Sequence, residues 1–197
     1  MASLFMGLAA FGLYLVYDIN SFQWQRKLPR TFFTAGTLLL AAAMITDTVA
    51  AVRAGAFSLL PDAAFLLLSV LFFAALIYSL FFALPFDETY AQQQNGRCVY
   101  DKGVYALCRH PGILCFFAMY LFLGLAALPY AGLLWRGMVF SLLNLMYAWF
   151  QDRVTFPKTF TDYPDYRKRA PFLIPTKASI HSAFRTFLNK AEEEDQP

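Results

Sequence analysis

Residues 108–112, Cys-Arg-His-Pro-Gly, place a guanidinium and an imidazole directly before an apolar run that begins at residue 111. Pro111 suits the first turn of a helix, because the N–H group that proline lacks would have no partner there. The free N–H groups at a helix start and the helix dipole both favour an anion. Arg109 adds a bidentate donor for a carboxylate or a phosphate, and His110 adds a second donor. The segment therefore predicts an anion site.

The carboxylate of Asp152 follows the end of the next apolar run of the chain. The runs at 111–128 and 131–150 are joined by only two residues, so the helices they predict are antiparallel neighbours. At the usual rise per residue they cover roughly 27 and 30 Å, so their ends are level. We therefore expect Arg109 to lie close to Asp152, which accepts hydrogen bonds from an ammonium or from ribose hydroxyls. The pair is complementary to a zwitterionic ligand that carries a carboxylate and an ammonium.

Another interpretation fits the same residue types. Arg and His at the start of a membrane helix commonly anchor the helix at the interface, and Asp152 with Arg153 is then a surface pair. On residue type alone, anchoring is the more frequent role, because short motifs are weak signals. The longer pattern of motif residues from 98 to 176 favours ligand binding.

The composition indicates that lipid surrounds the elements that position these residues. Of 197 residues, 59% are hydrophobic and 15% are charged, whereas soluble domains carry about 25% charged residues. Five predominantly apolar runs are each about as long as the roughly 20 residues that cross a bilayer. They predict an all-α integral membrane protein with five transmembrane helices, at 2–19, 31–52, 60–84, 111–128 and 131–150. The first run has no basic residue ahead of it and no cleavage pattern after it, so we expect a retained helix rather than a signal peptide.

The basic residues predict the orientation in the membrane. Three Lys or Arg lie in the loop at 20–30, three lie in the loop at 85–110, and eight follow residue 150. Only Arg53 and Arg136 are expected on the other side. Because positive charge stays in the cytoplasm, we predict an outside N-terminus and a cytoplasmic C-terminus. This distribution also accounts for the basic balance without a nucleic-acid partner and suits anionic lipid headgroups.

The remaining segments predict one membrane domain at 1–176 and a cytoplasmic tail at 177–197 that is amphipathic or disordered. The tail places four apolar side chains on one face of a helix, as interfacial helices do; they are Ile180, Phe184, Phe187 and Leu188. Asp47 lies near the outer end of the predicted helix at 31–52, where we expect it to reach the outer interface as an anchor. The three cysteines have neither disulfide nor zinc spacing, and no metal site is predicted.

The segment 98–176 resembles the integral-membrane methyltransferases of the isoprenylcysteine carboxyl methyltransferase and phospholipid methyltransferase group. That family carries Gly-x-Tyr-x-x-x-Arg-His-Pro, which is matched here by Gly103, Tyr105, Arg109, His110 and Pro111. A tail with Phe, spaced tyrosines and Pro-x-x-Ile-Pro follows the last helix in the family. Its matches here are Phe160, Tyr163, Tyr166, Pro171, Ile174 and Pro175.

The resemblance implies S-adenosylmethionine as cofactor and methyl transfer to a lipophilic acceptor, either a small molecule or a membrane lipid. It implies that Arg109 and His110 hold the cofactor carboxylate and that Asp152 holds its amino group or ribose. It further implies that Tyr105 and Tyr163 pack on the adenine or the sulfonium. Arg109 and Asp152 are the catalytic candidates; the cofactor-binding set is Gly103, Tyr105, Arg109, His110, Pro111, Gln151, Asp152 and Tyr163.

The sequence departs from the family at four positions. Ile113 and Cys115 stand where the family has tyrosine and glycine, and Gln151 and Asp152 stand where it has two glutamates. Two alternatives stay open. One is an NADPH-dependent membrane reductase, because sterol reductases carry a similar Arg-His-Pro element. The other is a catalytically degenerate family member that binds a lipid or a partner protein.

Overall fold

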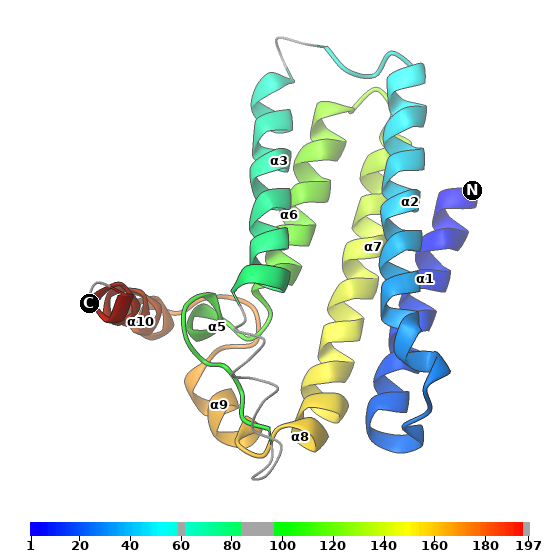
Figure 1. The fold of residues 1–197 in the computed structure, drawn as a ribbon. Coiled ribbons are helices and arrows are strands. Elements are labelled where there is room, and N and C mark those ends of the chain that lie inside the picture. Colours follow the sequence, from blue (N-terminus) through cyan, green and yellow to red (C-terminus); the bar gives the residue numbers. More distant parts are fainter. Residues whose placement is uncertain (59–61, 84–96, 195–197) are drawn as a thin grey trace. The chain divides into compact units, whose positions relative to one another are not determined.

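The computed structural model describes residues 1–58, 62–83 and 97–194 of the chain (Figure 1). In these residues the structure is helical and has no β-strand, and Arg97 and Phe160 form an isolated parallel bridge. The prediction of an all-α protein is confirmed for this part of the chain. The predicted loop at 85–110 lies partly outside the described residues.

The five apolar runs form helices close to the predicted positions. The helices are α1 (Ala2–Ile19), α2 (Phe32–Arg53), α3 (Ala63–Ile77), α6 (Pro111–Ala126) and α7 (Ala131–Phe150). The sequence predicts α6 to end two residues later than it does, and it predicts residues 60–84 as one helix. Within that run, α3 ends at Ile77 and a π-helical segment continues to Phe82.

Four of the helices in the described residues are long and apolar enough to cross a membrane when the adjoining helical segments are included. They are Ala2–Trp24, Leu28–Arg53, Ala63–Phe82 and Ala131–Thr159. α6 is apolar but shorter, at 16 residues. Because a spanning helix needs roughly 20 apolar residues, these elements indicate a multi-pass membrane protein.

Three of the apolar helices continue as π-helical segments. η1 (Asn20–Trp24) follows α1, η3 (Tyr78–Phe82) follows α3, and η4 (Gln151–Thr155) follows α7. π-helical turns widen the backbone spiral and occur frequently at functional sites. η4 carries Asp152, so the carboxylate that the sequence singles out lies in such a turn.

The contacts within the chain divide it into two compact units. Unit 1 comprises Met1–Phe73 and Phe116–Thr155, and unit 2 comprises Ala74–Cys115 and Phe156–Pro197. In unit 1, α1 packs against both α2 and α7 (Figure 1). The prediction of one membrane domain at 1–176 with a separate tail stays a prediction.

Glycines allow the helices of unit 1 to approach closely. A Cβ atom at Gly7 of α1 would overlap the Phe140 ring of α7. A Cβ at Gly137 of α7 would lie 2.6 Å from Tyr120 Cδ1 of α6. Small residues serve in this way at helix contacts in membranes, where no hydrophobic force drives helices together. The two contacts therefore fix α7 between α1 and the unit 1 part of α6.

Unit 2 contains short helices, one longer helix and an aromatic core. It contains α5 (Val104–Leu107), α8 (Phe156–Thr159), α9 (Tyr163–Arg169) and α10 (Lys177–Glu194). Tyr163, Tyr166 and Ala170 form its buried core. The Asp162 carboxylate accepts a hydrogen bond of 2.9 Å from the Val99 amide. These contacts join the segment before α5 to the segment after α7 in the sequence.

Candidate functional site

The Arg109–His110 pair is held by its own backbone and by aromatic rings of unit 2. The Arg109 amide donates a hydrogen bond of 2.9 Å to the Pro171 carbonyl. The imidazole of His110 stacks on Phe156 at 5.8 Å between ring centroids and meets Phe172 edge-on at 5.0 Å. The Arg109 guanidinium carbon lies 5.7 Å from the centre of the Phe172 ring.

These contacts are more specific than those of a solvated interface anchor. His110 is only 8% exposed, and Arg109 is half-buried. A guanidinium over an aromatic face gains a cation–π contact. Pro111 begins α6 as predicted, so the pair directly precedes the free N–H groups of a helix start. The arrangement suits an anion.

The motif residues before Arg109 are ordered by hydrogen bonds within unit 2. The backbone of Gly103 has a φ of 60°, a value that residues other than glycine rarely adopt. The Tyr105 hydroxyl donates to the Ser79 carbonyl at 2.8 Å, and the Tyr166 hydroxyl donates to the Tyr105 carbonyl at 2.7 Å. The sequence therefore places Gly103 and Tyr105 where they shape the loop that carries Arg109.

Tyr163 lies in the aromatic core of unit 2. It is 1% exposed, and its ring meets Phe156 at 5.4 Å and Tyr166 at 5.9 Å. In this position the ring supports Phe156, on which His110 stacks. Direct contact of Tyr163 with an adenine or a sulfonium stays a prediction.

Burial also bears on whether a cysteine beside the motif acts as a nucleophile. Cys108 is fully buried, and this burial raises the pKa of its thiol to about 11. The thiolate is the nucleophilic form, so Cys108 is a neutral thiol at physiological pH. Burial likewise raises the pKa of Tyr166 above its usual value. Neither group is suited to supply an anion for catalysis.

Asp152 belongs to unit 1 and is 2% exposed. The preceding residue, Gln151, donates a hydrogen bond of 3.0 Å from its Nε2 to the Tyr147 hydroxyl. Gln151 thus holds an amide, not a charge, beside Asp152. Because Arg109 lies in unit 2, its predicted closeness to Asp152 stays a prediction.

The structure adds a carboxylate that the sequence analysis missed. Asp18 of α1 is 3% exposed and accepts a hydrogen bond of 3.4 Å from Thr155 Oγ1. The side chains of Tyr147 and Gln151 also hydrogen-bond to its carboxyl group. An acidic residue inside an apolar run is a recognisable signal. It was overlooked here because Asp18 lies next to the end of the predicted helix at 2–19.

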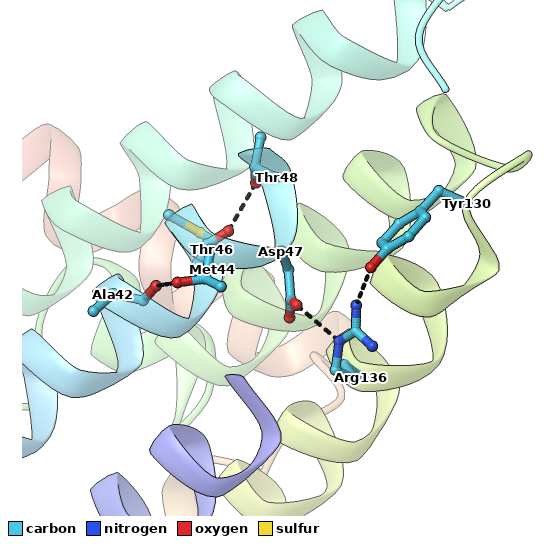
Figure 2. A network of polar contacts seen from close by, with 7 residues as sticks. All are labelled: Ala42, Met44, Thr46, Asp47, Thr48, Tyr130 and Arg136. Carbon is cyan, nitrogen blue, oxygen red and sulfur yellow. Dashed lines mark hydrogen bonds and ion pairs between the residues drawn. The ribbon is translucent and has the colours of Figure 1, made fainter. Parts of the chain in front are cut away.

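A second buried carboxylate lies in an ion pair (Figure 2). Asp47 Oδ1 of α2 lies 2.8 Å from Arg136 Nε of α7, and the side chains are 3% and 9% exposed. Arg136 also donates a hydrogen bond of 3.1 Å to the Tyr130 hydroxyl. The expectation that Asp47 reaches the outer interface as an anchor is therefore wrong. The Arg136 guanidinium lies close enough to the Asp47 carboxylate to pair with it inside the bundle. Asp47 therefore does not extend to water.

The predicted site residues fall in two different units of the chain. Unit 2 holds Gly103, Tyr105, Arg109, His110, Pro111 and Tyr163, and unit 1 holds Gln151 and Asp152. No group of three His, Cys, Asp or Glu among the described residues is placed to hold a metal ion. No family model, curated protein or solved structure matches the chain.

Proposed function

We propose that the chain is a membrane methyltransferase that binds S-adenosylmethionine on the cytoplasmic side and methylates a lipophilic acceptor. The observation that carries the proposal is the Arg109–His110 pair, held by Pro171, Phe156 and Phe172 directly before the start of an apolar helix. The N-terminus then lies outside and the C-terminus lies in the cytoplasm, as the basic residues predict.

The residues present fit the methionine end of this cofactor, which carries a carboxylate and an ammonium. Arg109 and the N–H groups at the start of α6 bind the carboxylate, with His110 as a second donor. Asp152, a buried carboxylate in η4, binds the ammonium or the ribose hydroxyls.

The cofactor supplies a methyl group activated on a cationic sulfur. The protein contributes alignment of the acceptor with that methyl group and exclusion of water, which together lower the barrier by removing the entropy of encounter. No acid is needed, and a carboxylate acceptor needs no base. This fits a site beside which the thiol of Cys108, the residue before Arg109, is neutral. Arg109 and Asp152 bind the reactant and need not exchange a proton.

The test is a titration of the purified full chain in detergent with S-adenosylhomocysteine, and separately with NADPH. We expect S-adenosylhomocysteine to bind. Arg109→Ala and Asp152→Asn each remove a charge-assisted interaction and should raise its Kd about 10- to 100-fold. Lys102→Ala and Asp165→Asn change exposed charges and should leave the Kd unchanged. Thermal unfolding of each variant separates lost binding from lost folding.

Three outcomes would overturn the proposal. NADPH binding without S-adenosylhomocysteine binding would favour the reductase. Binding of neither would favour a lipid- or partner-binding protein. Binding of S-adenosylhomocysteine that survives both Arg109→Ala and Asp152→Asn would place the ligand elsewhere.

A further inference from the structure

α10 has three distinct faces, and one of them is apolar and exposed. Ile180, Phe184 and Leu188 recur every four residues, so they form one row along the helix. They are 41%, 67% and 65% exposed. Isolated exposed apolar residues are common, but a continuous row marks an interaction surface.

A different face of α10 fixes the helix to unit 2. Ser179 and Ala183 are buried, and the Thr186 hydroxyl accepts a hydrogen bond of 3.0 Å from the Gly103 amide. The helix start is also defined, because Thr176 and Ser179 exchange backbone-to-hydroxyl hydrogen bonds of 2.9 and 3.2 Å. Such reciprocal bonds are those of a capped N-terminus. α10 is therefore a fixed element of unit 2, and its apolar row faces away from the side chains that attach the helix to this unit.

A basic row runs beside the apolar row. Lys177, His181 and Arg185 also recur every four residues, and all three are exposed. By helix geometry this row lies next to the row of Ile180, Phe184 and Leu188. Long basic side chains beside an apolar face place their charges among headgroups while the apolar groups enter the acyl boundary.

We propose that this surface of α10, the apolar row with its basic border, lies in the headgroup region of a membrane that contains anionic lipid. Lipid is always beside this chain, because the chain carries several helices long and apolar enough to cross a bilayer. The basic border is complementary to anionic headgroups, whose attraction for Lys and Arg near the surface is substantial. The proposal does not depend on the methyltransferase assignment.

The consequence concerns the Arg109 loop. The Gly103 amide bonds to Thr186, and a side chain on Gly103 would lie 3.6 Å from the Phe187 ring. α10 thus contacts the segment that leads to Arg109, and lipid contact along α10 holds this segment at headgroup depth.

The test uses the full chain in vesicles of phosphatidylcholine with phosphatidylglycerol, and in vesicles of phosphatidylcholine alone. An environment-sensitive NBD dye is attached to Phe184→Cys on the apolar row or to Ser182→Cys on the opposite face as the matched control. Cys98→Ser removes the exposed native thiol, and protein without an introduced cysteine gives the background. Dye emission and quenching by lipids that carry a spin label near the headgroup are then measured.

We expect blue-shifted emission and lipid quenching at position 184, at least about twice the quenching at position 182, because interfacial helices bury their apolar face about 5–10 Å deep. Water-like emission at both positions would overturn the proposal. Shielding at 184 without lipid quenching would also overturn it, because another protein surface or a second copy of the chain then covers the row.

The charge contribution has its own test. Lys177→Gln with Arg185→Gln should reduce quenching at position 184 in the anionic vesicles to the level seen in neutral ones. Unchanged quenching in the anionic vesicles would overturn the role of the basic row. Both substituted residues are exposed, and thermal unfolding confirms that the variant is folded.

Discussion

Two carboxylates of unit 1 are almost equally buried, yet their surroundings differ. Asp47 faces the guanidinium of Arg136 at 2.8 Å. Asp18 accepts a hydrogen bond from the neutral Thr155 hydroxyl, and the neutral side chains of Tyr147 and Gln151 also interact with its carboxyl group. One carboxylate is therefore neutralised by a permanent partner within the bundle. The neighbours of the other that the described residues show are polar and neutral.

The difference indicates different roles. An ion pair between α2 and α7 holds two helices together, and it presents no net charge to a ligand. Asp18 hydrogen-bonds to residues on both sides of Asp152, so its charge adds to the negative potential at η4. A site for the ammonium of a zwitterion gains from such a potential. We therefore expect the Asp47 region to govern stability and the Asp18 region to govern binding.

The largest expected effect is a loss of stability when only one partner of the Asp47–Arg136 ion pair is replaced. Arg136→Met leaves the Asp47 carboxylate buried without its partner, which typically costs about 3–5 kcal/mol. Thermal unfolding in detergent should show this loss. The double variant with Asp47→Leu removes both charges and should recover most of the stability. If single and double variants unfold at the same temperature, the pair does not join the helices.

A smaller effect on stability, with a larger effect on binding, is expected at Asp18. Asp18→Asn keeps the size of the side chain but removes its charge and one acceptor, at a cost of about 1–3 kcal/mol. We expect it to raise the Kd for S-adenosylhomocysteine several-fold. Asp47→Asn is the matched control, and it should lower stability without changing the Kd. Equal changes in Kd for the two variants would remove the distinction between the regions.

The smallest effects come from removing single hydroxyl groups. Tyr130→Phe deletes the hydroxyl that Arg136 contacts, and Thr155→Val deletes the hydroxyl that Asp18 contacts. Each hydrogen bond contributes about 0.5–1.5 kcal/mol to stability. Only Thr155→Val is expected to alter the Kd for S-adenosylhomocysteine, which isothermal titration can resolve. A change caused by Tyr130→Phe alone would reverse the assignment of the two regions.

Helix positions could be predicted from the sequence because the extent of an apolar run and the position of a proline depend on local structure. The start of α6 at Pro111 follows from that residue alone, and α1 ends where its run ends. The π-helical turns could not be predicted, because widening a helix by one residue leaves no trace in composition. η4 is such a case, and it carries Asp152.

The candidate site could be predicted only as far as local motifs allow. Arg109 and His110 are recognisable from their position before a helix, but their aromatic partners, Phe156 and Phe172, come from a segment more than 40 residues later. The pairing of Asp47 with Arg136 depends on how two helices pack, which periodicity does not specify. Asp18 was missed because it lies next to the end of the predicted helix at 2–19, although its type is visible in the sequence; only its partners on α7 and η4 depend on packing.

Methyl transfer tests the central claim most directly. Membranes that contain the full chain are incubated with S-adenosylmethionine labelled in its methyl group, and the label is measured in the organic extract. We expect a labelled lipophilic product that Arg109→Ala and Asp152→Asn each reduce by about 10-fold or more and that Asp165→Asn leaves unchanged. No label above that of membranes without the chain would contradict it.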